Sequence, residues 1–282
     1  MSENVVHIVN AFTANGEHGN PAGVVLDADE LTEEQMLDIA RQVNLSETAF
    51  VSASTVADKR VRFFTTTNEV DLCGHATIAT WSLLKSLGAV TSGHYSQETL
   101  AGVLQIDIQD DVIFMEQAPA TFYETIPAAE IAPLLGIKES DCNTALQPQI
   151  VSTGLKDLMI PVASKQILTD LRPDFEAIAA FSRQHDMYSF HVFALTADAS
   201  SIAVARNFDP AHDIQEECAT GTSNGGMLCY LKRYNALPSQ DMYRVEQGEA
   251  MEQLSYIYGK FAGDTVWIGG NAAVMGDRTV SI

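Results

Sequence analysis

Positive charge is scarce in this sequence. Its 282 residues include 16 Lys and Arg against 37 Asp and Glu, which gives a formal net charge of −21. Because binding to a phosphate backbone needs clustered Lys and Arg, this imbalance excludes nucleic acid as a partner. A small anionic carboxylate substrate would need a local positive potential, and the N-termini of two helices could provide one without any Lys.

Long apolar runs and cysteines are also few. No apolar run approaches the ~18 residues of a membrane-spanning helix, and the first residues do not resemble a secretory leader, so we expect no membrane partner. The four cysteines show no metal-ligand spacing and are too sparse for a disulfide framework. We therefore expect reduced thiols and a cytoplasmic protein.

Cofactor motifs are missing as well. The sequence lacks the glycine-rich dinucleotide fingerprint, the Walker A lysine motif, the H-E-x-x-H zinc motif and the nucleophilic-serine elbow. The sequence therefore does not indicate binding of nicotinamide, a nucleoside triphosphate or zinc. We expect acid–base chemistry with no cofactor and no metal. The 46% of hydrophobic residues indicates a globular chain, long enough for one large domain or two ordinary ones.

Two distant segments resemble each other, residues 71–85 and 216–232. In each, an acidic residue and a cysteine, Cys73 or Cys218, lead through glycine into small and apolar residues. We predict two turns that open into buried helices, whose N-termini could face one anionic ligand. The alternative is a pair of ordinary core helices entered through glycine turns.

The first of these helices is predicted to be buried on every side, because apolar residues fall all around it, and Gly88 is placed to end it. These apolar residues are Ile78, Ala79, Trp81, Leu83, Leu84 and Leu87. The second helix contains Gly225 and Gly226, which each cost roughly 1 kcal/mol relative to Ala in a helix interior. Their presence indicates the close approach of another backbone.

The order helix, strand, strand, buried helix and hairpin occurs twice along the chain. Thr32 and Gln35 predict a capping box that opens the first helix, and residues 174–185 predict its counterpart. The predicted strands are residues 5–12, 22–26, 45–51, 61–65, 104–108, 112–115, 149–153, 158–162, 189–195, 202–208, 254–258 and 265–268. The sequence therefore predicts a duplicated α/β (α+β) protein with domains at residues 1–118 and 119–271.

Glu47 is the best single candidate for chemistry. In the predicted strand 45–51 it shares a face with Leu45, Ala49 and Val51, which makes it the lone charge on an apolar row. Desolvation there would raise the pKa of its carboxyl into the range useful for proton transfer near neutral pH. The alternative is a carboxylate that lies at an exposed strand end or accepts hydrogen bonds from a loop.

His75 stands at the predicted start of the first helix, where it could donate a hydrogen bond to a substrate oxygen as a neutral imidazole. It could equally cap backbone groups in a buried turn.

Cys73 and Cys218 precede the two helices, and a thiol in that position is biased toward the thiolate. One from each half, on opposite faces of a carbon acid, would make a two-base racemase. The alternative is a pair of small buried hydrophobes, the only role we expect for Cys142 and Cys229.

The acidic residues before the second helix are expected to differ. Glu217 offers a second acid beside Cys218, whereas Glu216 is expected to be solvated.

Several motifs together resemble the phenazine-biosynthesis PhzF-like family, which has the diaminopimelate epimerase fold. The resemblance runs nearly end to end and includes Gly19-Asn20-Pro21-Ala22-Gly23, Ser46-Glu47-Thr48, Cys73-Gly74-His75-Ala76-Thr77, Val151-Ser152-Thr153-Gly154, Arg206-Asn207-Phe208 and Thr220-Gly221-Thr222. It implies two pseudo-symmetric lobes, each a β-barrel-like sheet around a central helix, with the active site between them. It also implies that residues 272–282 return to the first lobe and that the protein is a homodimer.

The resemblance implies roles for individual residues. Glu47 matches the proton-shuttling glutamate of the family, and His75 matches the histidine beside it. The family's second lobe usually reads Glu-Asp-Pro-Val-Thr-Gly-Ser, and here Glu217 replaces the aspartate, Cys218 the proline and Thr222 the serine. These departures leave the substrate and the phenazine pathway open and bring the chain closer to the two-cysteine epimerases.

Three hypotheses follow from these residues. The first is a cofactor-independent isomerase in which Glu47 moves a carbon-bound proton of a small carboxylate, assisted by His75 and Glu217. The substrate-binding residues expected for it are Gly74, Gly221, Thr222 and Asn20. The second is an amino-acid racemase or epimerase that uses Cys73 and Cys218. The third is a non-catalytic carboxylate-binding protein that keeps the duplicated fold.

Overall fold

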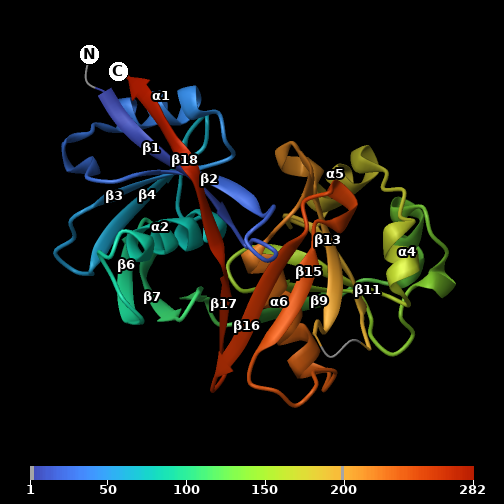
Figure 1. The fold of residues 1–282 in the computed structure, drawn as a ribbon. Helices are drawn as coiled ribbons and strands as arrows, with labels where there is room; N and C mark the ends of the chain where they lie inside the picture. The colour runs from blue at the N-terminus through green and yellow to red at the C-terminus, as the bar shows by residue number, and fades with distance from the viewer. Residues whose placement is uncertain (1–2, 198–199) are drawn as a thin grey trace. The chain divides into compact units, whose positions relative to one another are not determined.

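The computed structural model describes residues 3–197 and 200–282. The chain divides into two compact units, Met1–Glu116 with Gly269–Ile282, and Gln117–Ile268. Each unit contains its own group of paired strands and its own central helix, α2 in the first and α6 in the second (Figure 1).

The described residues of the first unit form the α-helices α1 (Glu33–Val43) and α2 (Gly74–Ser86) and the short 3-10 helix η1 (Ala28–Glu30). Its strands are β1 (Glu3–Ala11), β2 (Asn20–Val25), β3 (Thr48–Ser52), β4 (Lys59–Phe64), β5 (Glu69–Val70), β6 (Gly93–Thr99), β7 (Gly102–Gln109), β8 (Val112–Glu116) and β18 (Ala272–Ser281). The C-terminal strand β18 pairs antiparallel with β1 along its whole length.

Helix α2 lies inside this unit, with strands β1, β2, β3, β8 and β18 packed around it (Figure 1). All residues from His75 to Trp81 are buried, which confirms the prediction of a helix without a solvent-facing stripe. The prediction was wrong for Leu87, whose exposed fraction is 57%, because the helix has already ended there. Gly88 follows with φ 71°, as expected for the residue that ends a helix.

Helix α1 covers the outer side of the same sheet. Thr32 and Gln35 form the predicted capping box, in which each side chain accepts a hydrogen bond from the backbone N–H of the other residue. The predicted apolar stripe is buried and packs on Val6, Phe50 and Phe64. Asn44, with φ 53°, ends the helix in a left-handed turn and sends the chain toward β3.

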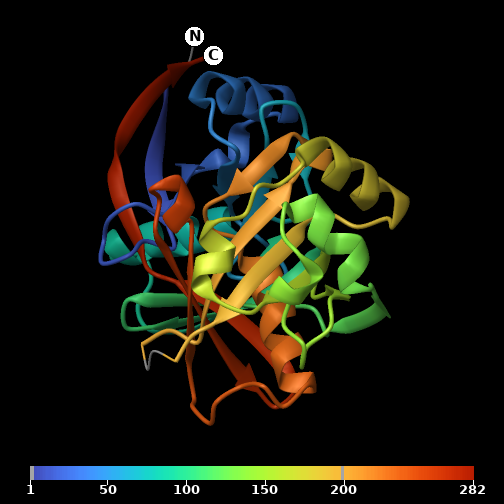
Figure 2. The ribbon, with the colours of Figure 1, turned by 90° about the vertical axis from the view of Figure 1, so that its right-hand side faces the viewer.

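The second unit carries α3 (Ala128–Ile131), α4 (Lys165–Thr169), α5 (Phe175–Gln184) and α6 (Gly221–Arg233), with short 3-10 helices η2 (Ala132–Leu135), η3 (Glu139–Asp141), η4 (Pro210–His212) and η5 (Glu249–Met251). Its strands are β9 (Thr121–Thr125), β10 (Gln149–Ser152), β11 (Lys156–Val162), β12 (Phe190–Leu195), β13 (Ala203–Asp209), β14 (Ile214–Glu217), β15 (Tyr243–Gln247), β16 (Ser255–Ala262) and most of β17 (Thr265–Gly270). Figure 2 shows α4 and α5 over the outer face of β12 and β13, where Leu168 and Ile178 join the apolar core.

The two units share one order of strand pairing. In the first, β1–β2 and β3–β4 are antiparallel, whereas β2–β3 and β4–β6 are parallel. In the second, β10–β11 and β12–β13 are antiparallel, whereas β11–β12 and β13–β15 are parallel. This repetition confirms the predicted α/β fold of two pseudo-symmetric halves. The predicted hairpin after each central helix was incomplete, because a further strand, β6 or β15, comes first.

The paired glycines of α6 admit close neighbours, as predicted, but these are side chains rather than backbone. A Cβ atom on Gly225 would lie 3.1 Å from Thr153 Oγ1 and 3.2 Å from Ile268 Cγ1, and one on Gly226 would lie 2.8 Å from Met159 Cε. The absence of side chains at these glycines therefore allows α6 to pack closely against strands of the second unit, among them β10 and β11.

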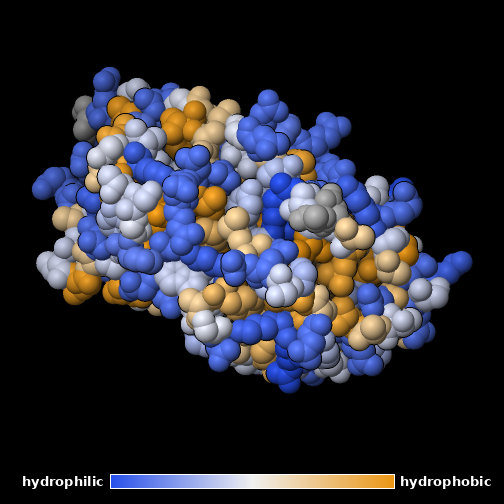
Figure 3. Space-filling view, turned by 60° about the horizontal axis from the view of Figure 1, so that its bottom comes forward, coloured by the Kyte–Doolittle hydropathy of each residue, from blue (hydrophilic) through white to orange (hydrophobic). Residues whose placement is uncertain are grey.

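Hydrophilic residues predominate on the face drawn in Figure 3, with hydrophobic residues gathered in smaller areas between them. Within residues 3–197 and 200–282, no helix combines the length and apolar composition that crossing a membrane would require.

Candidate active site

Glu47 lies one residue before β3 and not within it. The predicted strand began at residue 45, whereas β3 begins at Thr48. The alternation argument was also misleading, because both faces of β3 are buried, with the adjacent residues Ala49 at 0% and Phe50 at 1% exposure. The backbone at Glu47 is held by β2, since Gly23 N–H donates a hydrogen bond of 3.1 Å to its carbonyl oxygen. Glu47 therefore projects from the end of a rigid strand rather than from its side.

Cys73 and His75 come from the start of α2. Cys73 is the N-cap residue, and His75 lies in the first turn. Both are buried, with exposed fractions of 8% and 6%. In the described chain, the Cys73 side chain makes no capping hydrogen bond with that turn. The first N–H groups of α2 thus lack a side-chain cap from this residue.

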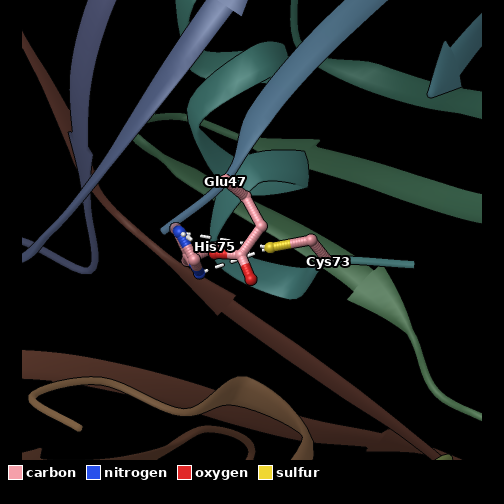
Figure 4. A group of neighbouring side chains, drawn as sticks. All are labelled: Glu47, Cys73 and His75. Carbon is pink, nitrogen blue, oxygen red and sulfur yellow. Dashed lines mark hydrogen bonds and ion pairs between the residues drawn. The ribbon is translucent and has the colours of Figure 1, made fainter. Parts of the chain in front are cut away.

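These three side chains converge (Figure 4). Glu47 Oε2 lies 3.4 Å from His75 Nε2, and Cys73 Sγ lies 3.4 Å from His75 Nδ1 and 4.0 Å from Nε2. Ser46 Oγ is 3.5 Å from the same Nε2 atom. The imidazole therefore stands between a thiol and a carboxylate.

The electrostatics favour a neutral imidazole beside a carboxylate that is short of donors. Burial lowers the pKa of His75, and the nearby charge of Glu47 opposes this only in part. Glu47 Oε2 is buried, yet no described residue forms a hydrogen bond with it, although the Glu47 side chain as a whole keeps 21% exposure. A buried carboxylate oxygen without a donor is costly unless a ligand or a proton satisfies it.

Two predicted binding residues of the first unit, Gly74 and Asn20, lie at the starts of different elements, a helix and a strand. Gly74 opens α2, and a Cβ atom there would meet Met115 Cε at an ordinary contact distance of 3.7 Å, so the helix start is not tightly covered at this position. Asn20 begins β2, is 6% exposed and pairs with Ala11 of β1.

The remaining predicted residues surround the start of α6 in the second unit. Gly221 is the first residue of α6 and Thr222 the second, and the Thr222 carbonyl accepts a hydrogen bond of 3.2 Å from Thr153 Oγ1. Glu217 ends β14, where its Oε2 atom accepts a hydrogen bond of 3.2 Å from Thr220 Oγ1. Thr220 makes no side-chain capping hydrogen bond with the described first turn of α6.

The predicted thiolate character of Cys218 was wrong. Burial, reinforced by the charge of Glu217, raises the pKa of the Cys218 thiol to about 11. Cys218 also stands three residues before Gly221, so it is not at the helix terminus that would stabilise a thiolate.

The predicted solvation of Glu216 was wrong too. Its carboxylate forms a two-point ion pair with Arg206, with Oε1–Nε at 2.8 Å and Oε2–Nη2 at 2.7 Å. Both side chains are largely buried, at 14% and 12% exposure. This pair ties β14 to β13 and leaves Glu217 as the acidic residue next to the thiol.

Sequence reasoning missed a buried polar network beneath α6. Asp157 of β11 accepts hydrogen bonds of 2.8 Å from Ser189 and from Ser223, and Asn207 donates to both serines at 2.9 and 3.1 Å. Asn207 Nδ2 also lies 3.2 Å from His191 Nδ1. The sequence signal that could have revealed this network is the presence of polar residues, Ser189, His191 and Asn207, within predicted strands.

Burial controls the charge of this network. It raises the pKa of Asp157 to about 7, against the opposing effect of the two serine hydrogen bonds. It also lowers the pKa of His191 to about 3, so that this imidazole is neutral. At neutral pH the network therefore contains a neutral His191 and an Asp157 carboxyl that is protonated in about half of the molecules.

Residues 9–278 match the family described as phenazine biosynthesis-like protein, PhzC-PhzF. The chain belongs to this phenazine biosynthesis-like family. An uncharacterized isomerase of Clostridium acetobutylicum is 34% identical over 285 residues, which span 95% of this chain and 94% of that one. The trans-2,3-dihydro-3-hydroxyanthranilate isomerase of Pseudomonas chlororaphis is 29% identical over 285 residues, with 97% and 98% covered.

The crystal structure of a PhzF-family phenazine biosynthesis protein from Bacillus anthracis has the same fold. Its TM-score is 0.90 at 31% sequence identity, and the match covers 100% of both chains. Together with the named relatives, this likeness identifies the chain as an isomerase of the phenazine biosynthesis-like family.

Proposed function

We propose that this family member moves a carbon-bound proton within a small carboxylate substrate, without a cofactor, and that Glu47 is the acid and base. The observation that carries the proposal is the buried Glu47 Oε2, which has no hydrogen bond from a described residue and lies 3.4 Å from His75 Nε2. A base in this state is ready to accept a proton from carbon, because no existing donor has to be displaced first.

His75 has a positioning and proton-relaying role in this proposal. Its neutral ring can donate one N–H to a substrate oxygen or to the Glu47 carboxylate, and accept a proton at the other nitrogen. Cys73, 3.4 Å from Nδ1, offers the second partner that fixes the orientation of the ring. Glu47 and His75 thus provide two proton-transfer groups in one first-unit cluster.

The substrate carboxylate is proposed to bind at the start of α2, the helix whose first turn carries His75. The first turn of α2 at Gly74 presents backbone N–H groups without a side-chain cap from the described N-cap residue, and in the second unit the first turn of α6 at Gly221 does the same. The helix dipole favours an anion at such an end. Such binding suits a chain that is short of Lys and Arg. Asn20, Thr222 and Glu217 are proposed to contribute to recognition and proton relay, as the family resemblance implies.

The two-cysteine racemase is disfavoured by the state of Cys218. In a reversible two-thiol mechanism each thiol must serve as the thiolate in one direction. Burial raises the pKa of Cys218 to about 11, so its thiolate is rare near neutral pH. The carboxylate mechanism has no such requirement.

Solvent hydrogen exchange tests the proposal directly. In deuterated buffer, proton NMR would follow loss of the carbon-bound signal across a panel of small carboxylates. The panel begins with trans-2,3-dihydro-3-hydroxyanthranilate, the substrate named for the Pseudomonas chlororaphis relative. We expect exchange by the wild type that Glu47→Gln abolishes and Cys73→Ser reduces much less.

Two results would contradict the proposal. Exchange that survives Glu47→Gln but not Cys73→Ser would favour the thiols. Saturable binding of a panel member with no exchange of any of its carbon-bound protons would favour a non-catalytic carboxylate-binding protein.

A further inference from the structure

The cluster at the start of α2 contains three different metal-binding atoms. Within the described residues, Glu47, Cys73 and His75 place one carboxylate oxygen, one sulfur and one ring nitrogen within 4.8 Å of one another. Two of these residues are buried and the third is half-buried, so their ligand atoms are held by the core rather than by mobile surface chains. The sequence showed no zinc-ligand spacing because Glu47 is far from the other two along the chain.

One separation agrees with that of a tetrahedral metal centre, and a second is slightly longer. With zinc–sulfur and zinc–nitrogen bonds of about 2.3 and 2.0 Å, tetrahedral sulfur and nitrogen ligands lie roughly 3.5 Å apart, and nitrogen and oxygen ligands roughly 3.3 Å apart. The Nε2–Oε2 distance between His75 and Glu47 is 3.4 Å, and Nε2 lies 4.0 Å from Cys73 Sγ. A small rotation of the Cys73 side chain would bring the sulfur into range.

The donor set also selects the class of ion. Sulfur and imidazole ligands suit zinc and similar borderline cations, whereas Mg²⁺ and Ca²⁺ prefer oxygen alone. Three protein ligands leave the fourth tetrahedral position open for water or for a substrate oxygen, as in catalytic zinc sites. The buried Glu47 Oε2, which makes no hydrogen bond with any described residue, would gain a strong partner.

We propose that Glu47, Cys73 and His75 form a binding site for Zn²⁺, and that the bound ion blocks the isomerase. On binding, the Cys73 thiol loses its proton to the buffer and its sulfur bonds to zinc, while Glu47 and His75 each donate an existing lone pair. No electron transfer is involved. Only the blocking of activity rests on the proposed function, because the binding itself needs no substrate.

Cobalt and zinc titrations test the binding. The full chain, purified without a histidine tag, is titrated with Co²⁺ and then with Zn²⁺ in competition with a chromophoric chelator. We expect one equivalent of Co²⁺ with intense visible bands of a tetrahedral site and a sulfur-to-metal charge-transfer band, displaced by Zn²⁺.

Variants locate the site. Since loss of an outer partner of a metal ligand already weakens affinity about 10–100-fold, removal of a ligand by Cys73→Ala or His75→Ala is expected to weaken zinc binding by about 100-fold or more. Cys229→Ala is the matched control, because Cys229 is likewise a buried thiol, in α6 of the other unit. We expect it to bind zinc as the wild type does. Circular dichroism of each variant establishes that it is folded.

Three outcomes would overturn the metal site. These are weak octahedral Co²⁺ spectra that indicate surface carboxylates alone, zinc affinity unchanged in folded Cys73→Ala, or an equal loss in Cys229→Ala. Hydrogen exchange assayed with and without Zn²⁺ separates the two proposals. Exchange without zinc binding would refute the metal site and leave the isomerase mechanism standing. Zinc binding by a protein that exchanges no proton in any substrate would do the reverse.

Discussion

Glu47 Oε2 lies 3.4 Å from His75 Nε2, although 27 residues separate the two in the printed sequence. The carboxylate comes from the end that precedes β3, and the imidazole from the first turn of the buried helix α2. Two rigid elements therefore fix the relative position of a candidate base and its neighbour. Glu47 itself lies on the short connection between α1 and β3, as many active-site residues lie on loops, and the hydrogen bond from Gly23 of β2 holds its backbone.

The position of the Glu47 carboxylate should matter as much as its charge. Glu47→Asp keeps the charge but withdraws the carboxylate by one methylene group, away from His75 and from a bound substrate. Because misplacement of a catalytic group by about 1 Å can reduce rates about 100-fold, we expect the initial rate of solvent hydrogen exchange to fall by about that factor. Glu34→Asp, on the exposed side of α1, is the control and should exchange at the wild-type rate. An unaltered rate in Glu47→Asp would argue against general acid–base catalysis by this carboxylate.

The buried Asp157 should make stability fall with rising pH. Its pKa is raised from 3.8 to about 7, so the folded state holds a proton that the unfolded state releases between those values. The contribution of Asp157 to the free energy of unfolding should therefore decline between about pH 4 and pH 7 by an amount on the order of a few kcal/mol. Asp209, whose pKa burial raises to about 6, acts in the same direction, whereas His191, whose pKa burial lowers to about 3, acts in the opposite one.

Urea unfolding of Asp157→Asn and wild type from pH 4 to pH 8 measures this contribution. The variant keeps an acceptor for one of the two serine hydroxyls, and we expect its free energy of unfolding, relative to that of the wild type, to rise between pH 4 and pH 7. Asp213→Asn, at an exposed position, is the control and should follow the wild type. Parallel slopes for Asp157→Asn and wild type would show that Asp157 titrates normally.

Cys218 should react slowly with alkylating agents. At pH 8 a thiol with a pKa of about 11 has roughly two orders of magnitude less thiolate than an ordinary cysteine of pKa about 8.5. We therefore expect its rate of modification by iodoacetamide, followed by peptide mass spectrometry, to be at least about 100-fold below that of free cysteine and to rise up to pH 10. A plateau below pH 9 would instead reveal a ready thiolate and strengthen the two-cysteine racemase.

Gly248 should tolerate no side chain. Its φ is 85°, and a Cβ atom there would lie 2.3 Å from the Gln253 carbonyl oxygen and 2.7 Å from that of Cys218. Since backbone cannot move aside as a flexible side chain can, Gly248→Ala should lower the free energy of unfolding by about 2–4 kcal/mol. Gly263 has φ 62° but open space around it, so Gly263→Ala should cost only about 1 kcal/mol. Similar urea midpoints for the two variants would refute this distinction.

Local features were predictable because their causes are local. Thr32 and Gln35 cap α1 through backbone groups three residues away, and the all-round apolar pattern of α2 reports burial directly. The repeated order of elements identified a duplicated fold before any strand pairing was known. The pairing later confirmed it.

Other features depended on tertiary structure. The sequence determined which residues carry acid–base, thiol and imidazole chemistry, but only the fold decided their environment. The sequence argument for Glu47 assumes a strand with one buried and one exposed face, whereas both faces of β3 are buried. Cys218 was assigned the wrong pKa direction, because desolvation depends on neighbours from distant segments. The Asp157 network and the Glu47–Cys73–His75 cluster arise only when separate strands and a helix meet, which no local spacing records.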